Sequence, residues 1–491
     1  MKRYTIDPIT RLEGHGKIEI FVDDNYQVKR AYLQVPEFRG FEKFCVGRPV
    51  EEMPRITCRI CGVCPPAHHT ASTKAADAVY KVEIPPLAKK LRELAYSAYY
   101  FSDHTLHIYA LGGPDFVLGP KAPKAQRNIL GVIQKVGLEV GKEVIKNRGY
   151  GQRILTIFGG KGVHPIYGVP GGISKGLTKE ERDEIIAMSD SMLEFAKFTQ
   201  KLIEDVVLKN KEYMDIILAE ENTMPTYYAG LVDENNYVNF YDGKVRVVDQ
   251  EGKEFAKFTP PEYLNHIAER TEQWSYLKFP YLKNVGWKGF SAGKDSGIYR
   301  VAPLARLNVA DGMATPLAQA EYEKMYDTLG GKPAHQTFAY HWARAIEQLY
   351  AAELLHKLIR EDDITGDEIR VVPTETPSEG VGIVEACRGT LIHHYKTDEN
   401  GIITDVNLIV ATVQNNAAMC MSLTDMARYI MDGKKRDFDE GDLNMIEMAF
   451  RAYDPCMACG THSLPGEMPL EVNIRSWDTG DILKSITRGL D

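Results

Sequence analysis

The sequence predicts a mainly α fold of the α+β class, in which long helices pack as a bundle core and β-hairpins lie at the periphery. Two observations lead to this prediction. Apolar residues recur with a helical period over long segments, and shorter segments alternate apolar with polar residues around turn-forming sequences. The chain has 491 residues, of which 44% are hydrophobic and 26% charged, so it can bury a large core.

Long helices are predicted in three places. Residues 87–111 carry an apolar stripe at helical spacing and are followed by two glycines. Thr178 and Glu181 form a capping-box pattern, which predicts the start of a helix over residues 179–218. A third stripe predicts a helix over residues 335–360.

Hairpins are predicted where alternating segments flank turn residues. They join residues 18–22 to 31–35 and residues 390–395 to 402–410, and a β excursion on the helical body covers about residues 233–258. Arg388 therefore lies at the start of the last hairpin.

The bulk composition excludes some classes of protein. A net charge of -9 argues against a nucleic-acid-binding surface, which needs clustered basic residues. No apolar stretch follows the basic start of the chain, so a signal peptide is not expected, and no window reaches the length of a membrane span. We therefore expect a cytoplasmic protein, in which thiols stay reduced and clustered cysteines bind metal.

Two Cys-x-x-Cys pairs lie near opposite ends of the chain, and each is followed by a histidine. The pairs are Cys61 with Cys64 and Cys456 with Cys459. Four thiolates are soft ligands for one metal site. A structural zinc cage is the alternative that spacing alone favours. The separation of the pairs along the chain, and the charged residues Arg59 and Asp454 beside them, argue instead for a chemical role.

The residues around these pairs resemble the large, catalytic subunit of nickel-iron hydrogenases. The two signatures are residues 59–68, RICGVCPPAH, and residues 454–462, DPCMACGTH. The resemblance extends along nearly the whole chain, through residues 7–15, 39–42, 104–107 with Asp115, 159–161 with His164, and 388–389. It implies the same helix-rich fold and an oxidoreductase that cleaves H2 reversibly into protons and electrons.

The resemblance implies a nickel-iron centre with carbon monoxide and cyanide on the iron. Cys61 and Cys456 would be terminal nickel ligands, and Cys64 and Cys459 would bridge both metals. Cys456 would take a proton from H2 and Glu13 would pass it outward, by general acid-base chemistry. For an isolated glutamate, a surface or capping carboxylate would be the better interpretation.

Further residues around the metals are implied by the same motifs. Arg388 would stand over the open metal position, held by Asp115 and Asp454, although each aspartate fits a structural ion pair equally well. His68 would direct a ring N–H toward a bridging thiolate. One departure is Cys387, which stands where the family usually has proline.

A magnesium ion and a removable tail are also implied. Glu42 and His462 resemble magnesium ligands. Residues 1–462 would form a single domain, and residues 463–491 a C-terminal extension that a maturation endopeptidase removes after a nickel chaperone has acted. The alternative is a permanent C-terminal strand, because apolar residues alternate in this tail.

Electrons must leave through another protein. Cys45, Cys58 and Cys420 lie outside the two signatures, and Cys58 is interpreted as a buried thiol. The sequence therefore offers no remaining cysteine cluster for an iron-sulfur centre. The implied partners are the iron-sulfur small subunit and further diaphorase-type subunits, with NAD(P), ferredoxin or electron bifurcation downstream. Two other classes remain open, namely the quinone-side subunit of respiratory complex I, which lacks the cysteines, and the zinc-stapled protein.

Overall fold

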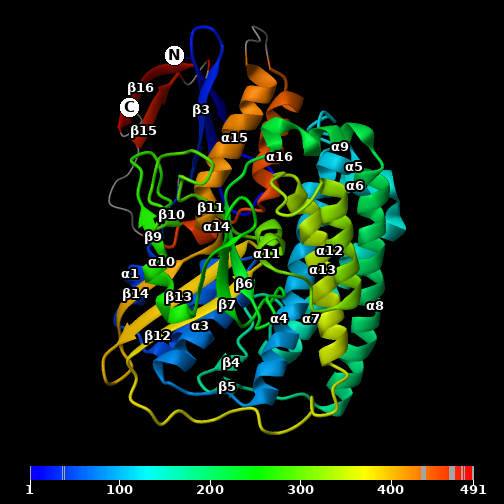
Figure 1. Ribbon diagram of the computed structural model, residues 1–491, viewed down its shortest axis with the longest axis vertical. Coiled ribbons are helices and arrows are strands. Elements are labelled where there is room, and N and C mark those ends of the chain that lie inside the picture. Colours follow the sequence, from blue (N-terminus) through cyan, green and yellow to red (C-terminus); the bar gives the residue numbers. More distant parts are fainter. Residues whose placement is uncertain are drawn as a thin grey trace.

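The computed structural model describes residues 2–35, 37, 39–432, 438–463, 470–476, 479 and 481–488. It has the predicted α+β architecture, with a helical bundle on one side and small sheets around it (Figure 1). The bundle helices are α4 (Pro86–Leu106), α7 (Leu138–Gly159), α8 (Lys179–Ile203), α12 (Pro316–Leu329) and α13 (Ala339–Leu358). Helix α13 packs against α4, α8 and α12, and α4 also packs against α7.

Two of the predicted long helices are interrupted. The segment from residue 179 does not run as one helix, because α8 is followed by a π-helix, η4 (Glu204–Leu208), and then by α9 (Lys211–Leu218). The Asn210 side chain accepts hydrogen bonds from the backbone of Glu212 and Tyr213, and so caps a new helix. The predicted capping box at Thr178 and Glu181 is present.

Helix α4 also ends earlier than predicted. It gives way to a π-helix, η3 (His107–Gly112), before α5 (Gly113–Val117). A Cβ atom at Gly113 would lie 2.3 Å from the carbonyl oxygen of Ile108, so only glycine allows this wide turn. His107, the first residue of this π-helix, contacts Asp454, which precedes the second cysteine pair.

Three sheets of three or more strands lie beside the bundle (Figure 1). The first is the N-terminal β1–β2–β3 meander, in which β2 and β3 form the predicted hairpin. The second contains the predicted excursion and has the order β11-β6-β7-β8. The third is the antiparallel sheet β12–β13–β14. The bounds are β1 (Lys2–Ile6), β2 (Lys17–Val22), β3 (Val28–Gln34), β6 (Tyr227–Val232), β7 (Lys244–Val248), β8 (Glu254–Phe258), β11 (Tyr299–Arg300), β12 (Glu379–Ala386), β13 (Gly389–Thr397) and β14 (Ile403–Ile409).

The helix α3 (Pro65–Val79) lies directly on β12 and β13. Gly380 and Gly382 make this close packing possible, because a Cβ atom at Gly382 would lie 2.2 Å from the carbonyl oxygen of Ala71. This packing brings the first cysteine loop, which precedes α3, next to the start of β13.

Shorter elements connect these layers. They are α1 (Phe41–Cys45), η1 (Val50–Glu52), α2 (Met53–Thr57), η2 (Cys58–Ile60), α6 (Ile129–Val136), β4 (Gly168–Val169), β5 (Gly172–Ile173), η5 (Glu220–Asn222), η6 (Pro260–Glu262), α10 (Tyr263–His266), β9 (Ile267–Arg270), β10 (Phe279–Leu282), α11 (Pro303–Val309), α14 (Ala411–Gln414), α15 (Asn416–Met431), α16 (Glu440–Ala452), α17 (Met457–Gly460), β15 (Leu470–Arg475) and β16 (Ile482–Arg488). The last two form a hairpin in the C-terminal extension. Among the described residues, no helix combines the length and apolar character that crossing a membrane requires.

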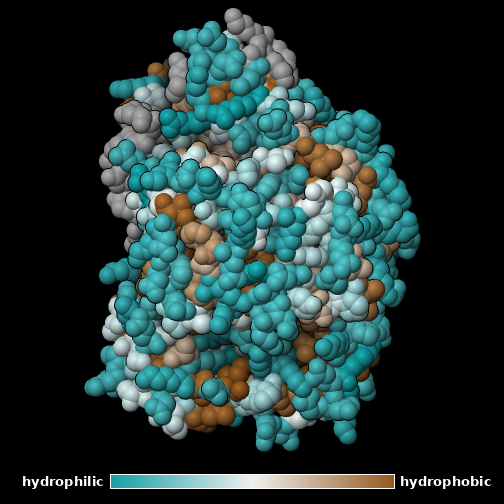
Figure 2. Space-filling model, viewed as in Figure 1, coloured by the Kyte–Doolittle hydropathy of each residue, from teal (hydrophilic) through white to brown (hydrophobic). Residues whose placement is uncertain are grey.

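The larger of two hydrophobic clusters includes the cysteine pairs. One large cluster of buried hydrophobic side chains extends from the N-terminal sheet through the bundle, and Cys61, Cys64, Cys456 and Cys459 belong to it. The face shown in Figure 2 is mostly hydrophilic, with apolar residues in small separate groups. The metal-type ligands therefore lie inside the protein and not on its surface.

Candidate metal centre

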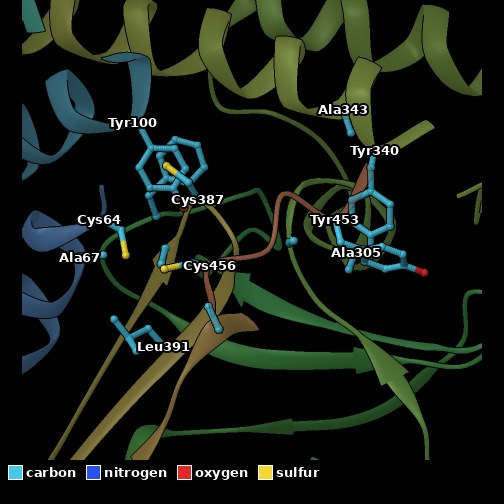
Figure 3. Packing of buried hydrophobic residues seen from close by; sticks show 14 of the residues in the cluster. Cys64, Ala67, Tyr100, Ala305, Tyr340, Ala343, Cys387, Leu391, Tyr453 and Cys456 are labelled. Carbon is cyan, nitrogen blue, oxygen red and sulfur yellow. The ribbon is translucent and has the colours of Figure 1, made fainter. Parts of the chain in front are cut away.

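The two cysteine loops meet in the interior. The Sγ atoms of Cys61 and Cys456 lie 3.3 Å apart, and those of Cys64 and Cys459 lie 3.1 Å apart. All four sulfur atoms lie within 4.8 Å of one another, and all four residues are buried. Figure 3 shows Cys64 and Cys456 facing each other above Leu391. Residues about 390 positions apart thus form one compact set of sulfur donors.

The N-terminal segment holds the second loop in place. The backbone N–H of Met457 donates to the carbonyl oxygen of Glu13 at 3.0 Å, and Glu13 and Cys456 pair as an isolated parallel bridge. Gly14 follows with a φ of 84°, and a Cβ there would lie 2.9 Å from Cβ of Met457. Arg39 donates to the carbonyl oxygens of both Ile60 and Ala458, so one guanidinium joins the two loops.

Glu13 is the carboxylate that touches the sulfur cluster. Its Oε2 atom lies 2.9 Å from Sγ of Cys456 and accepts a hydrogen bond from the backbone N–H of Ala458 at 3.0 Å. Burial raises the pKa of Glu13, and the nearby Cys61 raises it further. A raised pKa makes the carboxylate a stronger proton acceptor than an exposed one.

Arg388 lies at the other side of the cluster, between two carboxylates. It donates to both oxygens of Asp103, at 2.9 and 3.0 Å, and its Nη2 atom lies 3.0 Å from Oδ2 of Asp454. His107 Nδ1 lies 2.9 Å from Oδ1 of the same aspartate. Although burial alone would lower the pKa of Arg388, Asp103 and Asp454 raise it, so the guanidinium keeps its charge.

The structure corrects the expectation for Asp115. This residue does not hold Arg388, because its carboxylate lies between Arg11 and Arg451, with Arg451 Nε 2.9 Å from Oδ2. Asp103 occupies the expected place. The sequence contained a signal for it, since Asp103 directly precedes the His104 to His107 motif, but only folding shows that α4 carries it to Arg388.

His68 and Cys387 lie close to the sulfur cluster. The Nε2 atom of His68 lies 3.4 Å from Sγ of Cys459, which is a bridging position in the sequence-based assignment. Cys387 is fully buried and lies beside the ring of Tyr100 (Figure 3). Burial raises the pKa of the Cys387 thiol well above its usual range, so the thiol stays neutral.

The two candidate magnesium ligands are near each other. Oε1 of Glu42 lies 3.9 Å from Nε2 of His462. The backbone of Leu408 connects them, because its N–H donates to Glu42 Oε1 and its carbonyl oxygen lies 2.8 Å from His462 Nε2. Lys278 Nζ lies 3.8 Å from the other oxygen of Glu42. The carboxylate and carbonyl oxygens are the hard donor atoms that magnesium prefers, whereas imidazole nitrogen is a more usual ligand of transition metals.

The chemistry of the donor set fits a redox-active metal centre. Burial raises the pKa of Cys456 and Cys459 well above that of an ordinary thiol, so several thiolates in this interior need a cation to stabilise them. Within the described part of the chain, the four cysteines are the residues whose ligand atoms converge in a group of three or more. Sulfur donors of this kind suit nickel and iron as well as zinc.

Comparison with known proteins decides between these metals. A family model described as nickel-dependent hydrogenase matches residues 39–136 and 143–462, and a model described as HoxL-like matches residues 3–38. An F420-non-reducing hydrogenase iron-sulfur subunit of Archaeoglobus profundus is 49% identical over 486 residues, which cover 99% of each chain. The HoxS subunit beta of the NAD-reducing hydrogenase of Cupriavidus necator is 38% identical and covers 96% of this chain and 97% of that one.

A solved structure agrees in fold over the same length. The crystal structure of an NAD+-reducing [NiFe]-hydrogenase in the H2-reduced state superposes with a TM-score of 0.88 at 38% identity, covering 94% of this chain and 100% of that chain. The chain belongs to the nickel-dependent hydrogenase family. It is the catalytic large subunit of a nickel-iron hydrogenase, an oxidoreductase that acts on hydrogen.

Proposed function

We propose that this chain holds a nickel-iron centre, with carbon monoxide and cyanide on the iron, and cleaves H2 reversibly. The observation that carries the proposal is the buried set of four cysteine sulfurs with a carboxyl group in contact with one of them. Cys61 and Cys456 are proposed as terminal nickel ligands, and Cys64 and Cys459 as bridges. When bound, such a centre supplies the redox site at which H2 yields two protons and two electrons.

The protein side of the reaction is proton handling. Cys456 Sγ can hold a proton released at the site, and Glu13 Oε2 is close enough to receive it directly. Burial raises the pKa of Glu13, so its carboxylate accepts a proton more readily than an exposed carboxylate does. We propose that Glu13 then releases the proton toward solvent, because this side chain is only partly buried.

Arg388 is proposed to act by its charge. It is buried and held by Asp103 and Asp454, so its position is fixed before the reaction begins. A small cavity beside Cys64 and Cys459 is bounded by Ala67, Ala386, Leu391, Val410 and Ala411, together with the polar His68, Arg388 and Thr412. Its size and mostly apolar walls favour diatomic ligands such as carbon monoxide and cyanide. They also exclude bulk water.

The electrons are proposed to pass to an iron-sulfur small subunit, since within the described residues the converging cysteines form a single group. The NAD-reducing and F420-non-reducing names of the relatives support a soluble carrier such as NAD(P) or ferredoxin, reached through further diaphorase-type subunits, with electron bifurcation as one arrangement of that flow. A cytoplasmic location accords with such carriers.

The C-terminal part is proposed to take part in maturation. Glu42, the Leu408 carbonyl and His462 would bind magnesium where the domain of residues 1–462 ends. A maturation endopeptidase would remove residues 463–491 after a nickel chaperone has delivered the metal. Such an endopeptidase would cut after His462, and His462 and Ser463 are both buried in this uncut chain, so the proposal requires this junction to open before cleavage.

The test is infrared spectroscopy of the purified complex, with elemental analysis for nickel, iron and zinc. We expect bands from metal-bound carbon monoxide and cyanide together with stoichiometric nickel. Cys456→Ser should abolish nickel binding and turnover, because one donor of four is lost. Cys420→Ser is the matched control, since Cys420 is equally buried but lies outside the site. Stoichiometric zinc without these bands would refute the proposal.

A further inference from the structure

A chain of buried hydrogen-bonding groups begins at Cys459 and leads away from the metal centre. His68 Nε2 lies 3.4 Å from Sγ of Cys459, and His68 Nδ1 lies 3.2 Å from Nε2 of His393. His393 Nδ1 lies 2.6 Å from the hydroxyl of Tyr395, which lies 2.8 Å from Oγ of Ser72. Each of the five residues is at most 2% exposed.

The secondary structure explains why these groups meet. His68 and Ser72 are four residues apart on α3, so they lie on one face of that helix. His393 and Tyr395 are two residues apart on β13, so they point to the same side of the sheet. The close packing of α3 on the sheet brings these two faces together. This series of hydrogen-bonding groups therefore begins at Cys459 and ends at Ser72, which lies on the same helix as His68.

The hydrogen bonds between these groups run in one direction. The contact between His68 Nδ1 and His393 Nε2 needs one donor and one acceptor nitrogen. Burial lowers the pKa of His393 well below its usual range and raises that of Tyr395 well above its usual range. A neutral imidazole carries one N–H and one acceptor nitrogen, so the partner of one ring nitrogen decides whether the other nitrogen donates or accepts.

A thiolate that binds a metal only accepts hydrogen bonds, so its partner must be a donor. We propose that His393 and Tyr395 are positioning residues of the metal centre, which hold His68 in the tautomer that directs Nε2–H at Cys459 Sγ. In this tautomer, His68 Nδ1 accepts from His393 Nε2–H, and His393 Nδ1 accepts from the Tyr395 hydroxyl. The inference rests on the proposed function, which makes Cys459 a metal ligand.

The hydroxyl of Tyr395 is the adjustable end of the chain. In the structure it donates to Ser72 Oγ. Rotation about its C–O bond turns the same hydrogen toward His393 Nδ1, and no heavy atom has to move. A hydrogen bond at Cys459 Sγ draws electron density from the sulfur, so the sulfur donates less to the metals. Residues that touch neither metal nor substrate thus tune the electron density of the centre.

The experiment compares two tyrosine variants by infrared spectroscopy and redox titration of the purified complex. Tyr395→Phe removes the donor to His393. The control is Tyr263→Phe, because Tyr263 lies 2.9 Å from Nδ1 of His394, which points to the opposite side of β13. We expect Tyr395→Phe to move the carbon monoxide and cyanide bands to lower wavenumber and the midpoint potential to more negative values. Tyr263→Phe should leave both unchanged.

A second variant follows the chain one step closer to the metals. His393→Phe should shift the bands further than Tyr395→Phe, at unchanged nickel content, because it removes the direct partner of His68. Bands at wild-type positions in Tyr395→Phe, with nickel retained, would overturn the inference and leave the proposed function intact. Wild-type protein without nickel and without bands would overturn both. If His393→Phe does not fold, the comparison of the two tyrosine variants still decides the question.

Discussion

Two buried networks pair arginine with aspartate, one beside the cysteine sulfurs and one at the N-terminal segment, and they differ in what they hold. In the metal-side network, Asp103 and Asp454 fix Arg388 beside the cysteine sulfurs. In the N-terminal network, Asp115 lies between Arg11 and Arg451, and its carboxylate binds these two guanidinium groups. Residue type and burial are alike in both.

The two networks differ in the surroundings of their charged groups. In the N-terminal network, every charged group has a partner in a neighbouring element. Arg451 of α16 also contacts Glu447, which accepts a hydrogen bond from the Thr10 hydroxyl at 2.7 Å. The network thus ties the start of the chain to α16. Arg388, in contrast, borders the small cavity beside Cys64 and Cys459, whereas Arg11 and Glu447 border a separate cavity whose lining includes no cysteine. Complete pairing away from the sulfur donors indicates a structural role, and a fixed charge beside them indicates a chemical one.

Breaking the N-terminal network should have the largest effect on stability. Arg451→Met leaves the buried carboxylates of Asp115 and Glu447 without one cation, and such a loss costs about 3–5 kcal/mol. We expect the free energy of unfolding to fall by this amount, measured by chemical denaturation. Turnover per folded, nickel-loaded molecule should stay near wild type. Arg428→Met is the control, because Arg428 pairs with Asp425 in a partly exposed position. It should cost about 1 kcal/mol or less.

Breaking the metal-side network should instead affect turnover. Arg388→Lys keeps the positive charge but loses the forked contact with Asp103, so the charge is no longer fixed at the site. Loss of one preorganised electrostatic group slows turnover by roughly 10²–10³-fold. The measurement is H2 oxidation per bound nickel, with Asp103→Asn as a second variant that should act in the same direction. Near-normal turnover in both variants would contradict a chemical role for Arg388.

The same comparison shows what the sequence could predict. The cysteine pairs and their flanking motifs are local, so their spacing was enough to predict the sulfur set. Of the two carboxylates that hold Arg388, Asp454 was predicted and Asp103 was not, because Asp103 is 285 positions away along the sequence and Asp115 lies near the same motif. The helix break at Asn210 and the π-helix at Gly113 were missed for a similar reason. Each depends on one side chain, or on the lack of one, within an otherwise regular apolar pattern.

The hydrogen bonds that link Tyr395 and His393 to His68 could not be predicted from the sequence either. Alternation along the hairpin places both residues on one side of the strand, but it does not say which helix covers that side. The contact with α3 depends on Gly380 and Gly382, whose lack of a side chain lets the helix approach. The fold class was predictable from periodicity, while the connections between elements required the structure.

The smallest expected effect is a pH dependence of the stability that the N-terminal network provides. Burial alone would raise the pKa of Asp115, but the charges of Arg451 and Arg11 outweigh it and lower the pKa. A lowered pKa in the folded state means that the ionised carboxylate stabilises the protein above the unfolded-state pKa of about 4. This stabilisation is lost as the pH falls from there through the lowered pKa.

Asp115→Asn removes this titration. Its destabilisation relative to wild type should be full at pH 6 to 7 and should shrink as the pH falls below about 4, because wild type then loses the same charge. Denaturation of both proteins across this range gives the difference directly. Other acidic groups titrate alike in both proteins and cancel in that difference. A difference that stays constant down to the lowest pH would mean that the carboxylate's shape and hydrogen bonds, and not its charge, hold Arg11 and Arg451 in place.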